Sequence, residues 1–258
     1  MGMRLNIPLM LLLAIATLPL LAAAPRLHIN DEAHLPQAKM LKMQRDYPLW
    51  AERVFRYNHF ESSEPVKLVI SRSVHVGFYV DDTLYLPPDD EGEMLETFIH
   101  ELAHHATGHD SSFFLKEGIA SNTLEAVFLA QGQMPQGWPQ YGQSNDAWVS
   151  LYLKRGQLPP LKKFMDMDSF DGSSQDESFR SWQAYVVGAS FVGWIIKHEG
   201  YAAFRKVFDS EQLGPEGAAW ERRWQADIRA ENWPEFDVAD ALPRGERYQN
   251  YVRRLRAE

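Results

Sequence analysis

An H-E-x-x-H string at residues 100–104 constrains this chain more than any other feature of its sequence. His100 and His104 stand four residues apart within a stretch that predicts a helix. Residues at this spacing share one helix face, with Cβ atoms roughly 5–6 Å apart. Two imidazoles placed in this way can bind one zinc ion, each through one ring nitrogen. Glu101 lies beside them, where its carboxylate can accept a proton from a water at the metal.

The residues before the string favour a helix with one apolar face. Acidic side chains at the predicted first turn suit the positive end of the helix dipole. Apolar residues then recur at helical spacing, as an amphipathic helix requires. The alternative is an exposed helix that carries two histidines and a glutamate by chance. The acids are Asp89, Asp90 and Glu91, and the apolar residues are Met94, Leu95, Phe98, Leu102 and Ala106.

A catalytic zinc needs a third protein ligand, and one candidate is downstream. Glu117 belongs to an L-x-E-G-x-A string at the start of a second predicted helix, residues 115–129. A loop over 108–112 would let this helix fold back onto the first, and Gly118 would allow a close approach. The other interpretation is that Glu117 only stabilises a helix N-terminus by its charge.

The second candidate for the third ligand is local. Metzincins have the pattern H-E-x-x-H-x-x-G-x-x-H, which requires glycine at position 107 and a ligand at 110. This chain has Thr107, Gly108, His109 and Asp110, so the glycine is late and the histidine is early. The sequence therefore favours Glu117 over His109 or Asp110.

The H-E-x-x-H and E-G-x-A strings together make the chain resemble a gluzincin zinc metallopeptidase, and more narrowly the peptidase MA-like family. The resemblance covers about residues 66–208 and includes the apolar segment 185–194. It implies that His100, His104 and Glu117 bind one Zn²⁺ per chain and that Glu101 is the general base. The implied activity is hydrolysis of peptide bonds.

The resemblance also implies an α+β, zincin-like fold. Such a fold has a small mixed β-sheet with an edge strand packed on the H-E-x-x-H helix, followed by a mostly helical C-terminal part. The sequence predicts a helix over 36–60 and strands over 66–71, 74–80 and 83–86, the last two separated by a turn at Asp81-Asp82. Strand 83–86 precedes Pro87-Pro88 and is expected at the sheet edge, where an extended peptide substrate can pair with it. The alternative is a hairpin arm capped by its own loop.

One position departs from the gluzincin pattern. Many gluzincins have a carboxylate four residues after the glutamate ligand, where it orients a ligand histidine, and this chain has Ser121 there. Asn122 or Glu125 could take over that role. The departure gives some support to another function, a catalytically inactive peptidase-like binding module with structural zinc or none. Glu101 argues against that function, because a structural zinc needs no base.

Aromatic residues in two later segments are further candidates. Tyr185 begins the inner face of a helix predicted over 182–197, where the resemblance places it near the zinc site. It can donate a hydrogen bond to the oxyanion of the tetrahedral intermediate, or it can be a core tyrosine with a satisfied hydroxyl. In the predicted loop 131–145, Trp138 and Tyr141 either line a cleft or pack the loop itself.

The N-terminal sequence predicts export. Arg4 precedes an apolar run over 5–21 that ends in three alanines, so residues 1–24 are expected to be a signal peptide. An uncleaved N-terminal membrane anchor is the alternative. Residues 25–258 suffice for one domain with a helical C-terminal extension over 209–258. The expected location is periplasmic or extracellular, and the chain has no cysteine for a disulfide.

The net charge restricts the expected partners. The chain carries a formal charge of −9 and has no basic patch, which argues against a nucleic-acid partner. We expect a peptide or protein substrate drawn from exported or envelope proteins. No membrane association is expected once the signal peptide is removed, and the sequence does not specify an oligomeric state.

Overall fold

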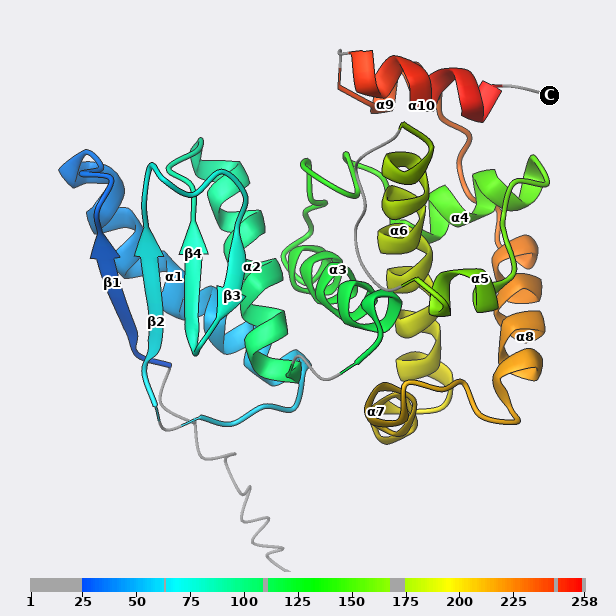
Figure 1. Cartoon of the computed structure of the whole chain (residues 1–258), viewed down its shortest axis with the longest axis horizontal. Coiled ribbons are helices and arrows are strands. Elements are labelled where there is room, and N and C mark those ends of the chain that lie inside the picture. The colour runs from blue at the N-terminus through cyan, green and yellow to red at the C-terminus, as the bar shows by residue number, and fades with distance from the viewer. Residues whose placement is uncertain (1–24, 63, 109–110, 168–174, 244–245, 257–258) are drawn as a thin grey trace, which may run out of the picture.

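Four strands form a mixed sheet in the order β1-β2-β4-β3 (Figure 1). The computed structural model describes residues 25–62, 64–108, 111–167, 175–243 and 246–256, so the expected signal peptide lies outside the described residues. Strands β1, β2 and β4 run parallel, and β3 is antiparallel to β4. The strands are β1 (Leu27–Asp31), β2 (Val66–Ile70), β3 (Phe78–Val80) and β4 (Thr83–Leu86).

Two helices cover one face of this sheet, α1 (Gln37–Tyr57) and α2 (Glu91–Thr107) (Figure 1). Strand β2 alternates accordingly: Leu68 and Ile70 are fully buried, whereas Lys67 is exposed and Val69 is half-buried. The buried strand residues pack with apolar residues of both helices in one core cluster. This alternation explains why the short strands could be recognised from their sequence.

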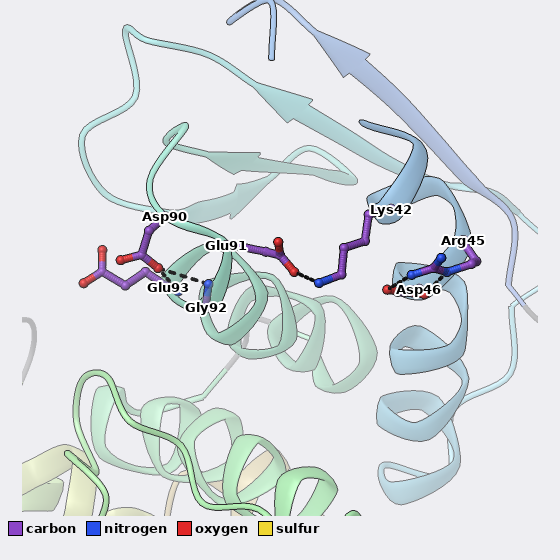
Figure 2. A network of polar contacts seen from close by, with 7 residues as sticks. All are labelled: Lys42, Arg45, Asp46, Asp90, Glu91, Gly92 and Glu93. Atoms are coloured by element: carbon purple, nitrogen blue, oxygen red, sulfur yellow. Dashed lines mark hydrogen bonds and ion pairs between the residues drawn. The ribbon is translucent and has the colours of Figure 1, made fainter. Parts of the chain in front are cut away.

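Polar contacts join the two helices at one end (Figure 2). Lys42 of α1 forms an ion pair with Glu91 in the first turn of α2. Lys39 donates a hydrogen bond to the carbonyl oxygen of Asp89, just before α2 begins. These contacts are solvent-exposed, so packing of the apolar faces contributes most of the stability at this interface.

Helix α3 (Phe113–Leu129) lies between the sheet half of the molecule and the helical half (Figure 1). It is buried on nearly all sides, as expected of a helix between two layers. Ala120 and Leu124 belong to the core on the sheet side, whereas Phe114 and Ile119 belong to the core on the helical side. Glu117 is therefore an acidic residue on a central, buried helix.

The rest of the chain is helical. Helices α4 to α10 pack around the second core, which contains Trp182, Trp224 and Tyr251. The rings of Trp182 and Tyr251 stack with centroids 5.2 Å apart, so the C-terminal helix is part of this core. The elements are α4 (Asn145–Lys154), α5 (Leu161–Met165), α6 (Gln175–His198), α7 (Tyr201–Ser210), α8 (Gly217–Ala230), α9 (Val238–Ala241) and α10 (Glu246–Arg256). None of the helices in the described ranges is long and apolar enough to span a membrane.

The α+β class, the small mixed sheet and the mostly helical remainder confirm the sequence-based prediction in outline. The predicted edge strand is wrong, because β4 pairs with β2 on one side and with β3 on the other. Asp81 and Asp82 both adopt left-handed φ angles of 47° and 56°, as in the two-residue turn that joins hairpin strands. This turn folds β3 back along β4 and makes β3 the edge strand on this side of the sheet.

Candidate metal centre

Local sequence signals define the ends of the two central helices. Asp90 caps α2 by accepting hydrogen bonds from the backbone N–H groups of Gly92 and Glu93, at 3.0 and 3.1 Å. Gly108 ends α2 with a left-handed φ of 87°. Ser112 caps α3 through the backbone N–H of Leu115. As predicted, the chain turns sharply after the H-E-x-x-H string and starts a second helix before Glu117.

This turn brings together the three side chains that the resemblance implies as metal ligands. The Nε2 atoms of His100 and His104 are 3.2 Å apart. Oε2 of Glu117 lies 3.1 Å from Nε2 of His100 and 3.3 Å from Nε2 of His104. Two nitrogens and one oxygen thus form a nearly equilateral triangle. The side chains are 7–13% exposed, so the triangle is partly sheltered from solvent.

The size of this triangle fits a tetrahedral zinc ion. Ligand atoms at about 2.0–2.1 Å from a tetrahedral metal are separated by about 3.3 Å. The three measured separations, 3.1 to 3.3 Å, are close to that value. Two histidines and one glutamate also form a known ligand set of catalytic zinc, with the fourth position left for water or substrate. The residues present therefore fit the metal that the sequence suggests.

Glu101 is the fourth polar group at this position. Ligand atoms of His100, Glu101 and His104 all lie within 4.8 Å of one another, so Glu101 is also close enough to approach a metal. Oε2 of Glu117 is closer to both histidine nitrogens, at 3.1 and 3.3 Å. Glu117 is thus the better third ligand, and Glu101 is left as a buried carboxylate beside the triangle.

The charges of the three groups support one another. Burial alone would raise the pKa of the Glu117 carboxyl, but His104 and His100 outweigh burial and hold that pKa far below its ordinary value. Burial alone would lower the pKa of His104, but Glu117 outweighs burial and raises that pKa. The site therefore keeps an ionised carboxylate in contact with two imidazoles, and a bound cation would be stabilised by the same carboxylate.

Tyr185 of α6 lies next to this group. Its ring stacks on the His100 ring with centroids 5.9 Å apart and an interplanar angle of 26°. Burial, followed by the negative charges of Glu117 and Glu101, raises the pKa of the Tyr185 hydroxyl well above its ordinary value. The hydroxyl therefore keeps its proton and remains a hydrogen-bond donor. The structure thus brings the tyrosine to the site, although its sequence position is far from the H-E-x-x-H string.

A close contact between two glycines fixes α3 against α6. A Cβ atom added at Gly118 would lie 2.8 Å from the carbonyl carbon of Gly188. Because both residues lack side chains, the two helix backbones touch at this point. Glu117 precedes one glycine and Tyr185 stands three residues before the other. This contact therefore sets the distance between the glutamate and the tyrosine.

The residues considered for orienting a ligand histidine have other surroundings. Glu125 accepts hydrogen bonds from the backbone and side-chain nitrogens of Asn145, and Asn122 accepts one from the Tyr57 hydroxyl. The Ser121 hydroxyl is fully buried and has no hydrogen-bond partner within the described part of the chain. The structure therefore directs Asn122 and Glu125 toward other parts of the protein.

His105, the histidine next to His104, joins α2 to the edge strand. Its Nδ1 atom is 3.0 Å from the Tyr79 hydroxyl of β3, which donates a hydrogen bond to Asp82 at 2.9 Å. Its ring packs against Phe55, with centroids 5.9 Å apart. His105 is therefore packed between α2 and the sheet half of the molecule. His109 and Asp110, the candidates for a metzincin-like ligand, lie outside the described residues.

Two contacts near the site were not foreseen from the sequence. Glu96 of α2 accepts hydrogen bonds from two backbone N–H groups of the loop between α3 and α4, at 2.7 and 2.8 Å. Arg205 of α7 donates a hydrogen bond to the carbonyl oxygen of Thr107 at the end of α2, at 2.8 Å. The partners are 40 and 98 residues apart in sequence, so no local pattern could have indicated either contact.

No protein-family model, no curated protein and no solved structure matches this chain.

Proposed function

We propose that this chain is a zinc-dependent peptidase of the gluzincin type, with a zincin-like fold and one Zn²⁺ held by His100, His104 and Glu117. The observation that carries the proposal is the triangle of two nitrogens and one oxygen, with sides of 3.1 to 3.3 Å. The two histidines lie on α2, which carries the H-E-x-x-H string, and Glu117 lies on α3, which carries the E-G-x-A string. The resemblance to the peptidase MA-like family is thus supported by a spatial arrangement that the strings alone do not contain.

The roles of the remaining residues follow from their positions. A zinc ion bound here would polarise the scissile carbonyl and make a water molecule more acidic. The Glu101 carboxylate takes a proton from the attacking water and passes it to the leaving amine, as a general base that becomes a general acid. Tyr185 donates a hydrogen bond to the carbonyl oxygen as negative charge develops there.

The substrate and the location are part of the same proposal. The substrates are peptides or proteins that are exported or belong to the cell envelope, and the enzyme acts in the periplasm or outside the cell. This part is supported by the N-terminal residues 1–24, whose charge and hydropathy pattern is typical of a signal peptide. Strand β3 pairs on its outer side with no other strand of the described residues and lies close to α2, so an extended substrate can pair with this edge.

Metal content of the purified mature protein tests the ligands. We expect about one zinc per wild-type chain by mass spectrometry and its loss in Glu117→Ala. Glu125→Gln is the matched control, because Glu125 is a buried carboxylate on the same helix with partners elsewhere. A folded wild-type protein that takes up no zinc would overturn the proposal.

Glu101→Gln tests the catalytic role separately from metal binding. The exchange keeps the size of the side chain and removes the base, so zinc should remain bound while peptide hydrolysis falls roughly 10²–10⁴-fold. A variant that keeps both its zinc and its full biological function would instead favour the inactive binding module.

A further inference from the structure

The loop between α3 and α4 is attached to the metal-ligand helix by one carboxylate. Glu96 accepts the backbone N–H of Gln136 at 2.7 Å through Oε1 and that of Gly137 at 2.8 Å through Oε2. Glu96 is 8% exposed, and both of its carboxylate oxygens accept a hydrogen bond. A Cβ atom added at Gly137 would lie 2.7 Å from Oε2, so a larger residue there would displace the carboxylate. The loop is therefore held against α2 at a defined point.

This point lies one helical turn from the metal site. Glu96 precedes His100 by four residues, so the two side chains share a face of α2. The loop residue that follows Gly137 is Trp138, and its ring meets the Tyr185 ring with centroids 5.7 Å apart. Tyr185 in turn stacks on His100 at 5.9 Å. Glu96 thus fixes the indole beside the residues that surround the zinc position.

The Trp138 indole packs against other aromatic rings and is partly exposed to solvent. Its ring lies with centroids 6.1 Å from the Tyr141 ring and 6.4 Å from the Trp182 ring, and Trp182 is fully buried in the second core. Trp138 itself is half-buried, so part of its side chain is exposed to solvent. Phe113 packs on Tyr185, which also contacts Trp138, with ring centroids 5.8 Å apart. The side of the site that faces this loop is therefore aromatic.

We propose that Trp138 is a specificity-determining residue, which makes the site prefer substrates with an aromatic or large aliphatic side chain beside the cleaved bond, and that Glu96 positions it. This inference rests on the proposed peptidase function. A substrate side chain that covers the exposed part of the indole removes apolar surface from water on both partners. A charged or very small side chain gains nothing from this contact, so the difference between substrates is a difference in binding to the aromatic surface.

Cleavage of matched peptides by the zinc-loaded protein tests the preference. The peptides differ only in the residues flanking the scissile bond, which are phenylalanine, leucine, glycine, aspartate or lysine. We expect kcat/KM of the wild type to be roughly 10- to 200-fold higher for phenylalanine than for glycine at one of the two positions. Trp138→Leu should reduce this ratio to a few-fold, whereas Trp220→Leu, a half-buried tryptophan on α8, should leave it unchanged.

Glu96→Gln tests the positioning role. A glutamine side chain replaces one carboxylate oxygen with an NH2 group, so one of the two loop N–H groups faces a donor and the loop loses its fixed point. The ratio for phenylalanine over glycine peptides should fall in this variant as well. Peptide binding to the Glu101→Gln background, measured by fluorescence anisotropy, should show the same preference and the same loss in Trp138→Leu, independently of turnover.

The outcomes separate this inference from the function on which it rests. Cleavage by the wild type with a preference that survives Trp138→Leu, or with no preference, would overturn the role of Trp138 and leave the peptidase function standing. No cleavage of any peptide by zinc-loaded wild type would overturn the proposed function and the inference with it. A preference that is lost in Trp138→Leu and kept in Trp220→Leu supports both.

Discussion

Gly188→Ala tests how the contact between α3 and α6 builds the site. A Cβ atom added at Gly188 would lie 2.8 Å from the carbonyl oxygen of Phe114 and 3.0 Å from the Cα atom of Gly118. Both atoms belong to the backbone of α3, so neither can rotate away as a side chain would. Ordinary contacts of a Cβ atom begin at 3.4 Å, and the two helices must therefore separate by several tenths of an ångström.

The size of the effect follows from two opposing contributions. Alanine is favoured over glycine inside a helix by up to about 1 kcal/mol. Overpacking of a close interface costs about 1–3 kcal/mol. Gly92→Ala in α2 is the matched control, because its Cβ atom would meet nothing closer than 3.5 Å. The free energy of unfolding of Gly188→Ala should thus be about 1–3 kcal/mol below that of Gly92→Ala, which corresponds to roughly 2–12 °C in melting temperature.

Thermal and urea unfolding followed by circular dichroism measure this difference. Zinc content should be unchanged in Gly188→Ala, because all three proposed ligands lie on α2 and α3. Turnover should fall, because Tyr185 moves with α6 away from Glu117. A Gly188→Ala protein that melts at or above the temperature of Gly92→Ala would refute the close contact and the reasoning built on it.

Three further changes probe separate parts of the site. Burial, followed by the charge of the neighbouring Asp146, raises the pKa of Glu125 to about 7 from 4.5. The stability linked to this group is therefore full below pH 4.5 and is lost as the pH rises through 7, by up to about 3 kcal/mol. Glu125→Gln should remove most of this decline in urea unfolding measured between about pH 4.5 and 8. Tyr185→Phe should keep its zinc and lower kcat roughly 10²–10³-fold in a peptide-cleavage assay, and an unchanged kcat would make it a core tyrosine. Tyr79→Phe removes the hydroxyl that contacts His105 and should lower the free energy of unfolding by about 1 kcal/mol in urea, more than a Phe exchange at an exposed tyrosine would.

Much of the fold could be predicted because its signals are local. The period of apolar residues predicted α1, and the acids before the H-E-x-x-H string predicted the start of α2. Glycine and serine between the two strings predicted the turn that brings Glu117 to the histidines. In each of these cases the residues that decide the structure are within a few positions of the structure they form.

The sheet was predicted less well because strand order depends on partners far along the chain. Strand β1 was not foreseen, since its five residues, Leu27–Asp31, include only two apolar side chains and their pairing partner begins at Val66. The choice of edge strand failed for a related reason. Pro87-Pro88 showed that hydrogen bonding ends after β4, but only the left-handed turn at residues 81–82 shows that β3 occupies the outer side.

The site itself combines both kinds of information, and this combination makes its parts separable by mutation. The spacing of His100 and His104 is set within one helix, and a five-residue string suffices to specify it. Glu117 depends on the turn after α2, Tyr185 depends on the glycine contact between α3 and α6, and Trp138 depends on a carboxylate 42 positions earlier. Each of these three contacts joins α2 or α3 to a different segment. Changing the turn should therefore alter metal affinity and turnover together, whereas changing the glycine contact should alter turnover with zinc retained, and changing Glu96 should alter substrate preference with zinc retained.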